Sequence, residues 1–415
     1  MRRTVLSAAV LALALASCGG SEGDERTERG APTTAASAPT ASATPSAIPT
    51  TSPTPTAPAG PEWRRAVPFW ARAIATDAAG AVYMTGSVEY GRAEPWGRPQ
   101  AMTLERSDTD GRQVWIRRWK SRDEWYMNAT GFDVAVSPDA DVVYVAGEIM
   151  DASGENRAIA VWAYSPEGRL LWSRQSPGSA FAPAAAASDA GVVVGGLGWL
   201  GAYDRDGTEL WVRDFEEPAG DHCDKVAGLA IAGDGEIYAV GLLDLTPTCN
   251  DTEGLVFEDA DIVIQKRSAS GDLRWSRVLT DPETDVDRAL AVDATERGVF
   301  VTGENDGRAW LARLAPTGRI RWTDRWGNAD PRAFGLDLSV SPWGALYVIG
   351  AGPPYDDPAT LYLRRYTIAG ELEWSWRRRL PGEAEAVALA TAAGDALYVM
   401  TSDVPERCLM WRLPA

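Results

Sequence analysis

One recurring stretch decides the fold, and its clearest copy is LARLAPTGRIRW at residues 311–322. It contains a short apolar strand, a turn that ends in Gly, and a Trp four residues after that Gly. Six Gly/Trp pairs keep this spacing of four and a seventh is one residue tighter: Gly111/Trp115, Gly168/Trp172, Gly207/Trp211, Gly271/Trp275, Gly318/Trp322, Gly370/Trp374 and Gly60/Trp63. A unit that recurs this often is the sequence signature of a repeat architecture.

Each repeat also contains two strands before this stretch. The second of them is rich in branched and aromatic residues, closes on Gly and recurs at 82–86, 143–147, 237–241, 299–303 and 346–350, with degenerate copies at 192–196 and 397–401. The first is rich in small residues, as at 71–76, 226–232 and 384–390. These compositions favour strands. Small side chains suit the innermost strand of a propeller blade, where the blades crowd around one axis.

The count of strands predicts an all-β, seven-bladed propeller over residues 61–415. Six units have four strands, whereas the last unit, 384–413, has three and lacks a Trp strand. The missing strand lies at the other end of the domain, at 60–65 around Trp63. We therefore expect the N-terminal strand to complete the last blade, which protects the sheet edges by closing the ring.

The Trp residues are predicted to dock between neighbouring blades. Seven positions belong to this structural set: Trp63, Trp115, Trp172, Trp211, Trp275, Trp322 and Trp374. Burial of about 200 Å² of indole contributes up to roughly 5 kcal/mol by area. An Arg follows two residues after five of these Trp residues, and we expect its stem to pack while its charge reaches an edge.

The repeat carries a resemblance to known families. The strand VYMTG at 82–86, with Asp110-Gly111 and Trp115, resembles bacterial seven-bladed propeller repeats with a Tyr-Val-x-Gly strand. The run at 314–322 is similar to the quinoprotein-type (PQQ-like) tryptophan-docking repeat. The resemblance covers about residues 61–415 and implies the fold, but both groups host unrelated functions.

The first 60 residues are predicted to direct export and tethering. Arg2 and Arg3 precede an apolar run that ends in Leu15-Ala16-Ser17-Cys18, which resembles a bacterial lipoprotein signal. Residues 1–17 would be the signal peptide and Cys18 the lipidated residue. Residues 18–60 are rich in Ala, Pro, Ser and Thr and predict a disordered tether. We expect a lipid-anchored, extracytoplasmic protein of the bacterial cell envelope, at the outer membrane or cell surface.

The charge of the chain argues against a nucleic acid as partner, and the positions of its cysteines predict a disulfide. Loss of Arg2 and Arg3 leaves 38 basic against 58 acidic residues, so a nucleic acid is an unsuitable partner. Export permits a disulfide, and Cys223 and Cys249 flank one hairpin on the same predicted face. We predict that they are bonded, with a metal site at Asp221–Asp224 as the competing interpretation. Cys408 is read as a small core residue, and the protein as a monomer.

The predicted working surface is the face that bears the long loops 87–101, 148–157, 242–260 and 351–359, since loops on a rigid scaffold concentrate function. Six aromatic residues in or near these connections could stack on sugars or grip a peptide: Tyr90, Trp96, Trp125, Tyr126, Trp199 and Tyr355. His222 is the only histidine, which limits His-based catalysis to a single centre.

These observations predict a non-enzymatic binding or scaffold module for a protein or a glycan. No catalytic residue, metal ligand or cofactor is assigned. Calcium at the acidic stretch 281–287 is left open, although a solvated acidic loop is the simpler interpretation. The alternative function is an envelope carbohydrate-active enzyme, a lyase or hydrolase that uses carboxylates of the acidic long-loop face.

Overall fold

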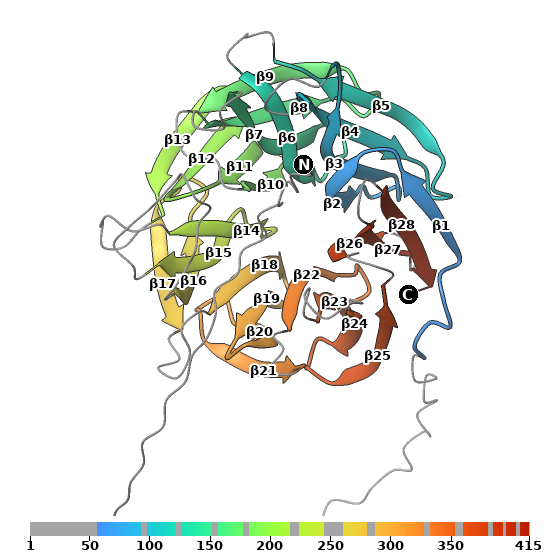
Figure 1. Ribbon diagram of the computed structural model, residues 1–415. Coiled ribbons are helices and arrows are strands. Elements are labelled where there is room, and N and C mark those ends of the chain that lie inside the picture. The colour runs from blue at the N-terminus through green and yellow to red at the C-terminus, as the bar shows by residue number, and fades with distance from the viewer. Residues whose placement is uncertain are drawn as a thin grey trace, which may run out of the picture.

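A computed structural model shows seven four-stranded antiparallel sheets arranged as blades around an open centre (Figure 1). It describes residues 56–92, 98–121, 126–151, 157–176, 182–215, 224–244, 260–279, 287–327, 333–352, 360–380, 385–392, 396–403 and 407–414. These residues form strands and turns and contain no helix. A helix able to cross a bilayer is accordingly not found among them. The prediction of an all-β, seven-bladed propeller is confirmed.

The strands of each blade run from the centre outward in chain order. Blade 1 comprises β2 (Trp70–Thr76), β3 (Val82–Glu89), β4 (Gln100–Ser107) and β5 (Gln113–Trp119), and blade 2 comprises β6 (Tyr126–Val136), β7 (Val143–Asp151), β8 (Arg157–Tyr164) and β9 (Leu170–Ser176). Blade 3 comprises β10 (Ala184–Ser188), β11 (Gly191–Gly195), β12 (Trp199–Asp204) and β13 (Glu209–Asp214). Blade 4 comprises β14 (Lys225–Ile231), β15 (Ile237–Asp244), β16 (Ala260–Arg267) and β17 (Leu273–Leu279). Blades 5 to 7 comprise β18 (Arg288–Thr295), β19 (Gly298–Asn305), β20 (Arg308–Leu314), β21 (Ile320–Trp326); β22 (Phe334–Val340), β23 (Ala345–Ala351), β24 (Thr360–Thr367), β25 (Leu372–Arg379); and β26 (Glu385–Ala392), β27 (Ala396–Asp403), β28 (Arg407–Pro414), with β1 (Trp63–Val67) outermost.

The last blade is closed by the N-terminal strand. β1 pairs antiparallel with β28 from Trp63↔Arg412 to Val67↔Cys408, and Figure 1 shows the two strands side by side at the start and end of the ring. The Cys408 side chain is buried at this closure, where its sulfur lies 3.2 Å from the backbone nitrogen of Ala71 in blade 1. The predicted closing strand is confirmed.

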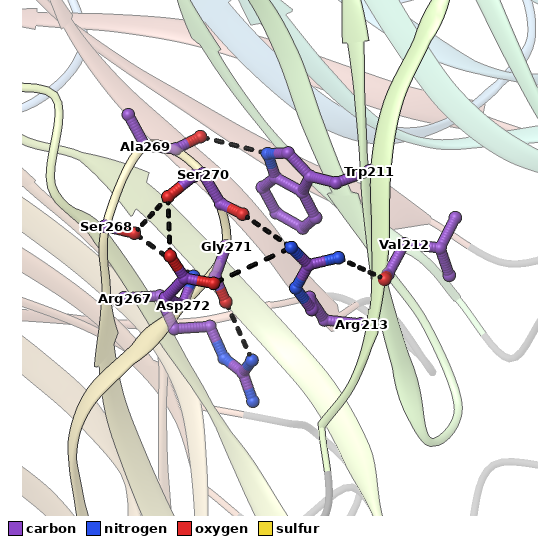
Figure 2. Close-up of polar contacts among 9 residues, drawn as sticks. All are labelled: Trp211, Val212, Arg213, Arg267, Ser268, Ala269, Ser270, Gly271 and Asp272. Carbon is purple, nitrogen blue, oxygen red and sulfur yellow. Dashed lines mark hydrogen bonds and ion pairs between the residues drawn. The ribbon is translucent and has the colours of Figure 1, made fainter.

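The seams between blades are built from the Gly/Trp pairs, as Figure 2 shows for blades 3 and 4. The Trp211 indole donates to the Ala269 carbonyl at 2.9 Å, and its ring lies so close to Gly271 that a Cβ there would stand 2.8 Å away. Gly271 has a φ of 82°. Glycine is therefore required both by the left-handed backbone of the turn and by the ring that covers it.

The same seam recurs around the ring. Five indoles donate to the carbonyl two residues before the partner Gly: Trp115 to Pro166, Trp172 to Arg205, Trp211 to Ala269, Trp275 to Pro316 and Trp322 to Ile368. Arg117 and Arg174 add a hydrogen bond of 2.7 Å from Nε to the carbonyl of Gly168 and Gly207, respectively. The recurrent Arg thus binds the turn of the next blade while its guanidinium lies over its own Trp.

Two seams beside the closing blade differ. The Trp63 ring covers Gly111, but its indole nitrogen has no hydrogen-bond partner among the described residues, and Tyr398 donates to the Thr109 carbonyl instead. Trp374 faces the split blade, which has no Gly turn, and packs with Ala57 in one apolar cluster. Its indole nitrogen is also unpartnered within the described chain.

Candidate functional site in the central channel

The seven innermost strands β2, β6, β10, β14, β18, β22 and β26 enclose a central cavity of about 560 Å³. Figure 1 shows these strands around the centre of the ring. This volume is within the usual range of small-molecule sites, roughly 300–1,000 Å³. The cavity is therefore large enough to hold a ligand, and its chemistry depends on which side chains replace the small residues of these strands.

One ring of the channel wall is set by β-bulges. Six inner strands share a bulge at an equivalent position, where the pairing with the second strand skips one residue that lines the cavity: Arg72, Phe132, Ala227, Leu290, Leu336 and Val387. A bulge re-aims a side chain, so the same irregularity in six blades assembles a ring. Arg72 is the one charged member, and its guanidinium carbon lies 4.7 Å from the Phe132 ring centroid.

Three aspartates of the wall join inner strands of adjacent blades. Asp133 accepts the N–H of Ala185, Asp293 that of Val340, and Asp337 that of Leu389, each at 2.8 Å. Burial raises the pKa of Asp133 to about 6 and that of Asp337 to about 7, because desolvation outweighs these hydrogen bonds. The pKa of Asp293 is raised for the same reason.

A charged group of six residues, here called the mouth cluster, lies at the end of the channel where the inner strands begin. Arg72, Lys225 and Arg288 stand at the start of β2, β14 and β18, and Arg157 begins β8, while Glu148 and Glu304 lie near the ends of β7 and β19. This end of the strands is the long-loop face. The cluster holds four cationic side chains against two carboxylates in a chain whose net charge is −18.

Some members of the mouth cluster hold each other. Arg288 donates to Glu304 at 3.1 Å and lies 4.9 Å from the Phe334 ring, while Arg157 is 3.7 Å from Glu148. The nearby carboxylate of Asp287 accepts from the Asn305 side chain at 2.7 Å and from the Asp306 backbone at 2.9 Å. Arg288, Arg157 and Asp287 therefore each have a partner within the protein.

Lys225 is different, because its ammonium forms no hydrogen bond or ion pair with any residue that the structure describes. Its side chain is half-buried and lines the cavity. Desolvation, with the neighbouring charge of Arg288, lowers the pKa of Lys225 to about 8, although Glu148 partly opposes this. Glu148 is 5% exposed, and desolvation raises its pKa to about 7 against the charges of Arg157, Arg72 and Lys225.

The site residues predicted from the sequence do not belong to the mouth cluster. Cys18, Cys223, Cys249 and His222 lie outside the described residues, so the lipidation, the disulfide and the competing metal site stay predictions. The same holds for most of the acidic stretch 281–287 and for the long-loop aromatics Trp96, Trp125 and Tyr355. The Tyr126 side chain is not described; Trp199 is buried; and the Tyr90 ring lies 3.9 Å from Lys120 Nζ.

The docking tryptophans all lie on outermost strands. Trp115, Trp172, Trp211 and Trp374 are buried, and Trp63, Trp275 and Trp322 are partly buried. They support the ring and stand apart from the channel. The channel residues Arg72, Asp133 and Lys225 were not anticipated from sequence. Arg72 and Asp133 interrupt runs of small or apolar residues on inner strands, which was an available signal, whereas Lys225 follows a polar stretch and gave none.

The comparisons with known proteins add no function. No family model and no curated protein matches the chain. A crystal structure of a protein of unknown function from Bacteroides caccae is 14% identical, with a TM-score of 0.41, and covers 71% of this chain and 93% of that chain. The Pan2 WD40 domain of Neurospora crassa is 10% identical, with a TM-score of 0.39, and covers 71% and 98%. Similarity this low does not transfer a role.

Proposed function

We propose that this propeller is a tethered binding or scaffold module that recognises a protein or a glycan through its long-loop face. The observation that carries the proposal is the asymmetry of the two faces. On one face, four blades have extended connections between their second and third strands, the longest from Asp244 to Ala260. The described connections on the opposite face are tight turns, as where Asp77 N–H donates to the Ala81 carbonyl at 3.0 Å.

A rigid ring with elaborated loops on one side is the usual arrangement of a recognition surface. The blades are joined at the rim by the Trp seams, so the strand ends from which the long loops leave are fixed relative to one another. Anchoring through Cys18, with residues 18–60 as the spacer, would present this face away from the membrane. Metabolic labelling with a fatty acid tests the anchor: wild type should incorporate label, and a Cys18→Ser variant should not.

Loop exchange tests the recognition role. Residues 245–259 of blade 4 are replaced by the tight turn Asn305-Asp306-Gly307 of blade 5 in the full-length, detergent-extracted protein. Wild type should bind an envelope protein or an array glycan that the exchanged variant loses, and a cooperative melting transition should show that the variant is still folded. The matched control exchanges the opposite-face turn 233–235 for Asn-Gly and should keep binding. A ligand bound equally by both variants would refute this use of the face.

A carbohydrate-active enzyme is the second candidate, favoured by the raised pKa values of Asp133 and Asp337 in a cavity, because such shifts concentrate at catalytic sites. Against it, each of these carboxylates accepts the N–H of the following residue at 2.8 Å as well as one from the next blade. Cleavage of an acidic or neutral polysaccharide that disappears in Asp133→Asn and Asp337→Asn variants would favour the enzyme.

A further inference from the structure

The mouth of the channel combines a cationic anchor with an apolar ring. Lys225 and Arg72 line the same cavity, and both charges act on Glu148, which places them around one end of the channel. Of the other cations of the mouth cluster, Arg288 pairs with Glu304 and Arg157 pairs with Glu148. The Lys225 ammonium has no partner among the described residues. Glu148 attracts the Lys225 charge without forming an ion pair with it, so a ligand that brings a negative group into contact with the ammonium would offset the cost of its desolvation.

The surroundings define what the ligand must carry. Four of the bulge residues are large and apolar: Phe132, Leu290, Leu336 and Val387. They come two residues later along their strands than the position of Lys225, so they lie deeper in the channel, at the same level as Arg72. Asp133 and Asp337 follow one residue deeper again. A negative group would therefore lie between Lys225 and Arg72, and an apolar group would contact the apolar members of the ring.

We propose that the channel mouth is a binding site for a small organic carboxylate with an apolar body. The carboxylate pairs with Lys225 beside Arg72, and the apolar body lies against the bulge ring. The Trp70 side chain is 46% exposed, and its ring centroid lies 5.4 Å from the guanidinium carbon of Arg72, a residue of the cavity wall. The site goes beyond the proposed recognition role, which concerns the loops around the same face.

Calorimetry with three probes tests the two halves of the site. Phenylacetate carries both the charge and the body, phenylacetamide keeps the body without the charge, and acetate keeps the charge without the body. Phenylacetate should bind the full-length protein at least 10-fold more tightly than either of the others. Because the phenylacetate carboxylate would form an ion pair with Lys225 near the surface, the affinity for phenylacetate should fall as salt is raised from 50 to 500 mM.

Variants of Lys225 identify the anchor. Lys225→Met should weaken phenylacetate at least 10-fold, and Lys225→Arg should retain most of the affinity. Lys266→Met is the matched control, because Lys266 lies on β16 and pairs with Glu236 at 3.4 Å, away from the channel. It should bind like wild type. Melting temperatures of all three variants establish that they are folded.

Chemical labelling gives a readout that does not depend on a substitution. The chain has only three lysines, Lys120, Lys225 and Lys266, so mass spectrometry resolves each of them. The pKa of Lys225 is lowered and that of Lys266 is raised, so a larger share of the Lys225 amine is unprotonated and reactive at pH 8. Phenylacetate should protect Lys225 at least fivefold from acetylation and leave Lys266 unchanged.

Three results would overturn the site. They are no detectable binding of phenylacetate up to 10 mM, equal binding of phenylacetamide, or full affinity in folded Lys225→Met. Recognition of a protein or glycan by the loops would survive any of them. Conversely, a loop-exchanged variant that loses its partner but still binds phenylacetate would separate the two functions.

Discussion

The rim of the ring and the wall of its channel both join neighbouring blades, but they do so by different physics. At the rim, an indole covers a glycine turn and donates to its backbone, and the arrangement repeats with little change. In the channel, small residues pack closely and three aspartates accept backbone N–H groups from the next blade. At the rim the same Trp seam recurs with the same side chains, whereas in the wall the bulge position recurs but the side chain that occupies it changes from blade to blade.

This difference assigns most of the stability to the rim and leaves the channel wall as the place for a ligand. A seam made of buried aromatic surface contributes several kcal/mol, because burial scales with apolar area. A buried carboxylate contributes little, since desolvation opposes its hydrogen bonds. Lys225 and Arg72 do not recur from blade to blade, and the ligand proposal rests on them.

The largest expected effect is at the closure of the rim. Deleting residues 61–67 removes β1, its pairing with β28 and the Trp63 ring. Because the ring then has an open edge, its melting temperature should fall by more than about 10 °C in calorimetry. A variant that keeps the wild-type melting temperature would show that the ring does not depend on this strand.

A single seam should be next in size. Trp172→Ala removes a buried ring and a 2.7 Å hydrogen bond, so the free energy of unfolding should fall by about 3–5 kcal/mol in urea titrations. Trp374→Ala removes a ring that is equally buried but whose indole nitrogen has no hydrogen-bond partner among the described residues, and should cost about 1 kcal/mol less. A loss below about 1 kcal/mol at Trp172 would contradict the seam.

The glycine side of the seam is tested by a pair of substitutions. Gly207→Ala places a Cβ 2.6 Å from the Trp172 ring in a turn with a φ of 78°. Gly235→Ala has nearly the same φ, 81°, with only an Ala269 methyl 3.9 Å away. Both carry backbone strain of about 1–2 kcal/mol, and Gly207→Ala should add about 1–3 kcal/mol of overpacking. If both variants lost the same free energy of unfolding, the Trp172 indole would have moved aside without cost, which would contradict tight packing at the seam.

The channel wall should give the smallest effect, visible as a pH dependence. The pKa values of Asp133 and Asp337 in the folded protein, about 6 and 7, lie above the ordinary value near 3.8. The folded state thus binds more protons between about pH 4 and 7, so its stability is lost as pH rises through this window. The melting temperature should be a few degrees lower at pH 8 than at pH 5.

Two variants localise that pH dependence. Asp337→Asn should reduce the slope of melting temperature against pH, because one titrating group is gone while Asp133 and Glu148, with pKa values of about 6 and 7, remain. Asp139→Asn is the control: a hydrogen bond from Ser137 and the ion pair with Arg205 hold the pKa of Asp139 at about 2, so this group does not titrate in the window. An unchanged slope in Asp337→Asn would assign the effect elsewhere.

The sequence by itself determined the number of blades, the strand order and the closure by the N-terminal strand. These follow from local patterns, because the Gly at the turn and the Trp four residues later recur wherever a blade meets the next. It also indicated the side with long loops. Its predictions of lipidation at Cys18 and of a Cys223–Cys249 disulfide rest on residues that the structure does not describe.

Only the tertiary structure decided which residues meet in the channel. Arg72, Glu148, Lys225 and Asp337 come from four different blades, and their separation in sequence conceals that they share one channel. Whether Lys225 has a partner depends on the packing of side chains from several strands, and the pKa shifts depend on how much water that packing excludes. A repeat pattern records contacts between neighbouring blades, whereas the chemistry at the axis is set by all seven blades at once.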